Sequence, residues 1–168
     1  MLKRLARLLA IGAIVAATLA PALAQTTAAA DEAPIRAIIE TALPERINAA
    51  DAKAVAALWS EAGTHGGLIV GARIRDGRES VQQMWATGFS QPSRDPARKL
   101  SVAISRIQFL RPDVASVDAR NTYHGGQTAA GTLRPDTGEL LFAVLTRENG
   151  TWTIASSRVV PLISSSAR

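Results

Sequence analysis

The order of apolar and polar residues after position 30 separates a helical first part of the chain from an extended second part. Apolar residues recur at spacings of three and four in three segments before Pro92, which predicts three amphipathic helices. From Lys99 onward they alternate with polar residues, which predicts strands. The pattern therefore predicts one α+β domain over residues 31–163, in which a curved antiparallel sheet wraps over N-terminal helices.

The first helical segment begins after Asp31, where an acidic residue and Pro34 suit an N-terminal turn. Its apolar positions continue past Pro44, which lacks an amide hydrogen and crowds the carbonyl four residues earlier. We therefore expect this helix to bend or break at Pro44. Its apolar stripe consists of Ile35, Ile38, Ile39, Ala42, Leu43 and Ile47.

Two shorter helices are expected to follow the first. Asp51 is a suitable cap for the second helix, and Gly63 ends it. Its buried face consists of Val55, Leu58 and Trp59. The third helix starts near Gly77, and its buried face consists of Val81, Met84, Trp85 and Phe89. Between these helices, residues 68–70 favour an extended segment because two of the three are β-branched.

Four strands are predicted in the second part of the chain, over residues 99–109, 114–123, 140–147 and 151–160. The parity of the apolar positions shifts between Ser105 and Ile107, which predicts a bulge in the first strand. Arg111-Pro112-Asp113 predicts a turn after it. Asn149-Gly150 is typical of the tight turn of a hairpin, so the last two strands are expected to pair.

The first 24 residues show the features of a cleavable signal peptide: a basic start, an uncharged apolar run and small residues at its end. Cleavage is expected between Ala24 and Gln25, which predicts a periplasmic or secreted protein with no membrane attachment after cleavage. An uncleaved membrane anchor is the alternative, because no charge occurs between Arg7 and Asp31.

Cleavage would change the charge of the chain. The full chain carries 19 basic and 14 acidic residues, a net charge of +5. Lys3, Arg4 and Arg7 leave with the signal peptide, so the mature chain has 16 basic against 14 acidic residues, a net charge of +2. This small excess argues against a nucleic-acid partner. The chain has no cysteine, which excludes disulfides. Residues 25–30 are a predicted tether and residues 164–168 a predicted tail.

Several motifs, in this order and spacing, resemble those of one superfamily. They are Asn48-Ala49-Ala50-Asp51 with Ala56-Ala57-Leu58-Trp59, then Gly77-Arg78-Glu79-Ser80-Val81, the segment 109–118, and Asn149-Gly150-Thr151-Trp152-Thr153-Ile154. The set resembles the nuclear transport factor 2-like (NTF2-like) superfamily, within it the SnoaL-like proteins, and in particular the small exported proteins of the SgcJ/EcaC family. The resemblance implies a cone of bent sheet closed by helices, with an apolar cavity, often paired into a homodimer through the sheet.

In this superfamily the cone serves enzymes such as ketosteroid isomerase as well as binding modules, so the fold does not decide the function. Alignment on the motifs puts the general base of ketosteroid isomerase at Gly67 or Leu68. The two hydrogen-bond donors fall near Leu43 and Val144. None of these side chains performs such a role, so the resemblance does not imply that reaction. Arg158 stands where SgcJ/EcaC relatives often carry a histidine.

Six residues are candidates for lining the cavity. They are Trp59, His65, Trp85, Asn121, Tyr123 and Arg158. The tryptophans are equally suited to a core. His65 is either a proton shuttle near the rim or an exposed loop residue. Asn121 and Tyr123 share the parity of an apolar strand face, and either orient a ligand or form a buried pair bonded to backbone. Arg158 either binds an anionic group or lies in solvent.

Three hypotheses about function follow. The protein binds a small, largely apolar molecule in its cone, or it is a SnoaL-like enzyme of isomerase, cyclase or hydratase type that uses His65 or Tyr123 for proton transfer. A third hypothesis is a structural role through the sheet. No cofactor is predicted, and no metal site, because His65 and His124 lack the grouping that zinc ligands need.

Overall fold

The computed structural model describes residues 32–67 and 73–162. Its internal contacts divide the chain into two units, Met1–Pro34 and Ile35–Arg168, and the fold described below is that of the second unit. The predicted signal peptide with its cleavage site, the tether, the tail and the extended segment 68–70 lie outside the described residues. These remain predictions.

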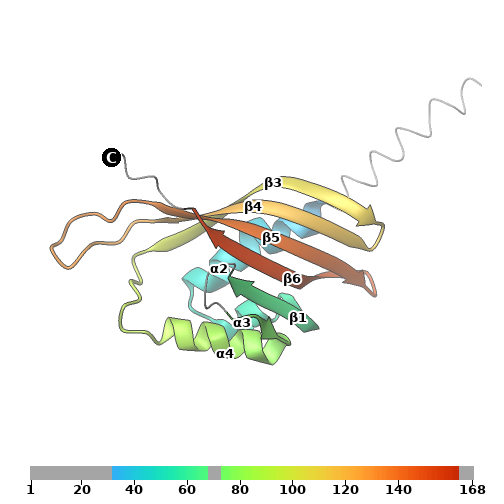
Figure 1. The fold of residues 1–168 in the computed structure, drawn as a ribbon, viewed down its shortest axis with the longest axis horizontal. Coiled ribbons are helices and arrows are strands. Elements are labelled where there is room, and N and C mark those ends of the chain that lie inside the picture. The colour runs from blue at the N-terminus through green and yellow to red at the C-terminus, as the bar shows by residue number, and fades with distance from the viewer. Residues whose placement is uncertain (1–31, 68–72, 163–168) are drawn as a thin grey trace, which may run out of the picture. The chain divides into compact units, whose positions relative to one another are not determined.

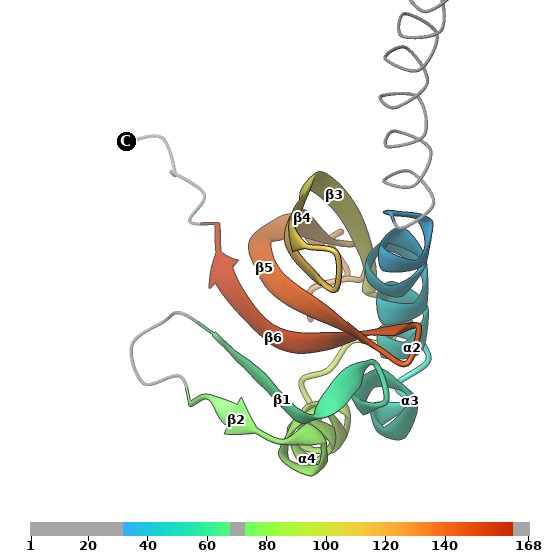
Figure 2. The same cartoon turned by 90° about the vertical axis from the view of Figure 1, so that its right-hand side faces the viewer.

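Helices and one mixed sheet make up the second unit (Figures 1 and 2). The helices are η1 (Ala37–Ala42), α2 (Leu43–Asn48), α3 (Ala52–Ala56) and α4 (Arg78–Phe89). The strands are β1 (Trp59–Gly67), β2 (Arg75–Asp76), β3 (Lys99–Arg111), β4 (Val114–His124), β5 (Thr137–Glu148) and β6 (Thr151–Pro161). The predicted α+β class is therefore confirmed.

The strand order in the sheet is β2-β1-β6-β5-β4-β3. The strands β3 to β6 form the predicted antiparallel meander, and Figure 2 shows how strongly it curves. The sheet also contains two strands that were not predicted, β1 and β2, and it is mixed because β1 lies parallel to β6. Strands β1 and β6 are far apart in sequence, and no local turn signal marks a parallel pair of this kind.

The first helix does not break at Pro44. Residues 37–42 form a π-helix, a wider turn in which the amide of Leu43 donates to the carbonyl of Ile38, five residues earlier. Pro44 then occupies the first turn of α2, where a missing amide hydrogen costs little. The wider turn thus absorbs the crowding that the proline would cause in a regular α-helix.

The second helix ends earlier than predicted. It stops at Ala56, with Asp51 capping it as expected, and Trp59 already belongs to β1. Gly63 therefore does not end a helix and lies inside the strand. A Cβ atom at Gly63 would lie 2.8 Å from the carbonyl oxygen of Ile154, so the close approach of β6 requires glycine there.

The predicted irregularities of the strands are confirmed. The register of β3 against β4 shifts between Ile104 and Arg106, where the bulge was expected. Asn149 and Gly150 have φ values of 50° and 79°, which is the left-handed geometry of a tight hairpin turn. A further irregularity was not predicted: β6 carries one extra residue, Ala155, where its register against β5 shifts.

The core lies between the helices and the concave face of the sheet. The helical segments η1 and α2 also cover the open edge of β3. Ile35, Ile39 and Val55 are fully buried on the helical side. The Asn48 amide bonds both backbone groups of Leu100, at 2.9 and 2.8 Å, and Glu40 accepts from the amide of Ile104 at 2.8 Å. These side chains replace the missing neighbouring strand.

Candidate functional site

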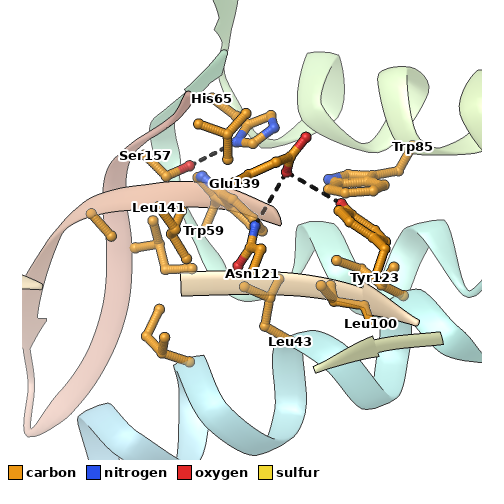
Figure 3. A pocket seen from close by; sticks show the side chains of 15 residues that line it. Leu43, Trp59, His65, Trp85, Leu100, Asn121, Tyr123, Glu139, Leu141 and Ser157 are labelled. Atoms are coloured by element: carbon orange, nitrogen blue, oxygen red, sulfur yellow. Dashed lines mark hydrogen bonds between the residues drawn. The ribbon is translucent and has the colours of Figure 1, made fainter. Parts of the chain in front are cut away.

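A cavity of about 190 Å³ lies between the helices and the concave face of the sheet (Figure 3). Its walls are mainly apolar, and a few polar side chains gather at one end. Five of the six predicted residues line it: Trp59, His65, Trp85, Asn121 and Tyr123. The other lining residues are Ile39, Leu43, Ile47, Leu100, Glu139, Leu141, Ala143, Ile154, Ser157 and Val159.

A carboxylate is the centre of the polar end. Asn121 on β4 faces Glu139 on β5 across the ladder, and Tyr123 lies two residues farther along β4. The Tyr123 hydroxyl and the Asn121 amide nitrogen both donate to Oε2 of Glu139, each at 3.4 Å. Burial, followed by the charge of Glu139, raises the pKa of Tyr123 well above its ordinary value. Tyr123 therefore acts in this site as a hydrogen-bond donor.

The Asn121 side chain leaves one buried acceptor without a partner. Asn121 is 5% exposed, and its Oδ1 accepts no hydrogen bond in the described part of the chain. The carboxylate of Glu139 fixes this orientation, because a flipped amide would place two acceptors against each other. The Nε1 of Trp85 is likewise buried and unpaired. Native proteins rarely leave such groups unsatisfied, and both residues line the cavity.

His65 is held in a neutral state at the other side of the polar end. It lies on β1 opposite Ser157 of β6, and its Nδ1 is 2.7 Å from the Ser157 hydroxyl. The imidazole packs against Trp59 and Trp85, with ring centroids 5.5 and 5.8 Å away. Burial, and secondarily the charge of Arg158, lower its pKa from 6.5 to about 4. The interpretation as an exposed loop histidine is therefore wrong, since His65 is only 8% exposed.

Arg158 does not line the cavity. In the sequence Arg158 shares the parity of the buried Trp152 and Ile154, but the extra residue Ala155 reverses the parity of every later position on β6. Ser157 consequently points into the cavity and is 1% exposed. The guanidinium of Arg158 instead donates to the Thr64 hydroxyl at 3.1 Å and to the Ser157 carbonyl at 2.6 Å.

Sequence reasoning missed Glu139 and Ser157. Glu139 precedes the predicted start of its strand, which in the structure begins earlier, at Thr137. A signal was available, because Glu139 shares its parity with the buried Leu141 and Ala143. No comparable signal marks Ser157, since the composition around Ala155 does not reveal a bulge.

Two other expectations concern metals and membranes. His124 lies exposed at the end of β4, away from the cavity-lining residues. Across residues 32–67 and 73–162, no three His, Asp or Glu side chains are grouped closely enough to hold a metal ion. Within the same ranges, no helix has the length and apolar character to cross a membrane.

Neither a family model nor a curated protein matches this chain. Solved structures do match it. An NTF2-like protein with a cystatin-like fold from Novosphingobium aromaticivorans gives a TM-score of 0.67 at 18% identity, covering 86% of this chain and 90% of that one. The chain has the NTF2-like fold.

Two further structures agree with this assignment. A domain of unknown function with a cystatin-like fold from Nostoc punctiforme gives a TM-score of 0.66 at 19% identity, covering 81% of this chain and 80% of that one. A ketosteroid isomerase-like protein from Erwinia carotovora gives 0.57 at 21% identity, covering 73% and 89%. Identities this low show the NTF2-like fold alone, and the finer resemblance to SnoaL-like and SgcJ/EcaC proteins stays a prediction.

Proposed function

We propose that the protein is exported and binds a small, largely apolar molecule in the cavity of its NTF2-like domain. The observation that carries this proposal is the unpaired Oδ1 of Asn121, an acceptor buried at the polar end of a mainly apolar cavity. An unsatisfied buried acceptor costs about 1–3 kcal/mol, which a donor on a ligand would recover. The apolar walls supply the rest of the affinity through burial of the ligand.

The volume of the cavity limits the size of the ligand. An apolar protein cavity of about 150 Å³ holds benzene. The cavity of about 190 Å³ therefore suits one ring with a short substituent. It is smaller than the pockets of roughly 300–1,000 Å³ that hold drug-sized molecules.

A thermal-shift titration with benzyl alcohol tests this proposal. The ligand is expected to raise the melting temperature in a concentration-dependent manner, because it binds only the folded state. Ala143→Leu fills the cavity from β5 and is expected to abolish the shift. Ala103→Leu adds the same volume at an exposed position of β3 and is expected to keep it.

Two outcomes would contradict binding in this cavity. One is a wild-type protein whose melting temperature does not respond to benzyl alcohol, toluene or cyclohexanol. The other is an Ala143→Leu variant that responds as strongly as the Ala103→Leu control.

An enzymatic function is the alternative, and one observation favours it: the carboxylate of Glu139 and the phenol of Tyr123 face the same cavity. His65 is a weak base because its pKa is lowered to about 4. We therefore assign the role of base to Glu139 and the role of donor to Tyr123. This reaction would be proton abstraction next to a carbonyl, with the oxygen held by a donor.

Deuterium exchange at the α-carbon of cyclohexanone in D₂O tests the enzymatic alternative. It predicts exchange faster than in buffer for the wild type and at the buffer rate for Glu139→Gln. Equal rates for the two proteins would leave binding as the function.

A further inference from the structure

The charge of the cavity indicates the chemical class of its ligand. The lining residues include one carboxylate, Glu139, and no lysine or arginine. His65 lines the cavity as a neutral ring. We propose that the ligand is a small organic cation, a protonated amine on an apolar body, whose ammonium group lies against Glu139. This inference rests on the proposed binding function.

The first argument is the weak compensation of the carboxylate. Glu139 is half-buried and forms no ion pair with any described residue. Its two donors among the described residues, Tyr123 and Asn121, are neutral and lie 3.4 Å away, longer than the roughly 2.5–3.0 Å usual for hydroxyl donors and 2.7–3.2 Å usual for amide donors. A carboxylate in an apolar cavity is stabilised far more by a cation that also donates hydrogen bonds.

The second argument is the set of unused acceptors. Oε1 of Glu139 has no hydrogen-bond partner among the described residues, and Oδ1 of Asn121 is buried without one. Figure 3 shows both side chains at the polar end of the cavity, with the Asn121 amide nitrogen turned toward Glu139. An ammonium group carries three donors and no acceptor, so it suits a polar end that offers free acceptors, whereas a carboxylate ligand would be repelled by them.

The third argument is the aromatic wall. Trp59, Trp85 and Tyr123 line the cavity around the carboxylate, and Figure 3 shows Trp85 beside the phenol end of Tyr123. The face of an aromatic ring attracts a cation, and tryptophan attracts it most strongly. The same rings also accommodate the apolar body of the ligand.

The charges of two arginines outside the cavity act in the opposite direction. The charge of Arg98 lowers the pKa of Tyr123, and that of Arg158 lowers the pKa of His65. Neither residue lines the cavity, and both guanidinium groups donate to protein oxygens outside it. If these charges governed the site, an anion would bind in place of a cation, so the test includes one.

Three ligands of nearly equal size separate these possibilities: benzylammonium, benzyl alcohol and benzoate. Their dissociation constants are measured near pH 7 by calorimetry or by NMR titration of the purified protein. We expect benzylammonium to bind at least about tenfold more tightly than benzyl alcohol. Benzoate is expected to bind most weakly.

Two variants test whether Glu139 causes the preference for benzylammonium over benzyl alcohol. Glu139→Gln is expected to bind benzylammonium no more tightly than benzyl alcohol. Glu148→Gln removes the same charge at an exposed position of the same strand, and is expected to keep the preference.

The inference is overturned if benzyl alcohol or benzoate binds the wild type as tightly as benzylammonium. It is also overturned if folded Glu139→Gln retains the preference for benzylammonium over benzyl alcohol. Equal binding of all three ligands would leave the proposed function intact, whereas binding of none of them would refute both.

Discussion

The buried imidazole of His65 is expected to make the protein less stable in mild acid. The pKa of His65 is lowered in the folded state to about 4 from 6.5, mainly by burial and then by the charge of Arg158. The unfolded chain therefore takes up a proton at a pH at which the folded chain does not. The stabilisation is complete above pH 6.5 and is lost as the pH falls from there toward 4.

The size of this effect follows from the two pKa values. Between about pH 7.5 and about pH 5, the unfolded state binds nearly one additional proton at this position and the folded state almost none. The linkage relation then gives a loss of about 2 kcal/mol in the free energy of unfolding over this interval. Other groups titrate over the same interval, so the effect is measured as a difference between variants.

Urea unfolding of the wild type, His65→Gln and His124→Gln at both pH values measures this difference. His65→Gln is expected to lose about 2 kcal/mol less than the wild type between the two pH values. His124→Gln replaces the exposed histidine at the end of β4 and is expected to behave like the wild type. Each variant is its own reference, so any pH-independent cost of the substitution cancels. An equal pH-dependent loss in His65→Gln and wild type would refute a neutral His65.

Three further predictions concern other parts of the chain. Asn48→Ala is expected to lower the free energy of unfolding by about 2–3 kcal/mol, because it leaves both backbone groups of the buried Leu100 unpaired. A decrease below about 0.5 kcal/mol in urea unfolding would contradict this expectation. We propose a homodimer through the outer face of the sheet, where Leu140 and Phe142 are 36% and 41% exposed. Light scattering is expected to find a dimer for the wild type and a monomer for Phe142→Glu. A monomeric wild type would rule out this dimer. Mass spectrometry of the exported protein is expected to find Gln25 at the N-terminus, whereas Met1 there would indicate the retained anchor.

Much of the fold could be predicted because its apolar positions keep a regular period. The third helix, the bulge in β3 and the Asn149-Gly150 hairpin all follow from local pattern. The end of the second helix could not be predicted in this way. Trp59 continues the buried face of that helix in sequence, yet it pairs with Ile154 on β6, and this long-range contact takes precedence over the local preference.

The candidate site was predictable only where its residues lie within an apolar stripe. Asn121 and Tyr123 extend such a stripe on β4, and their positions in the cavity follow from parity. Glu139 extends the stripe of Leu141 and Ala143 in the same way, but a charged residue at a strand end resembles a loop residue by hydropathy. On β6 the parity count fails at Ala155, and the two polar neighbours Ser157 and Arg158 exchange faces. Counting outward from buried positions therefore finds the polar groups of such a cavity up to the first bulge, and beyond it only the structure assigns them.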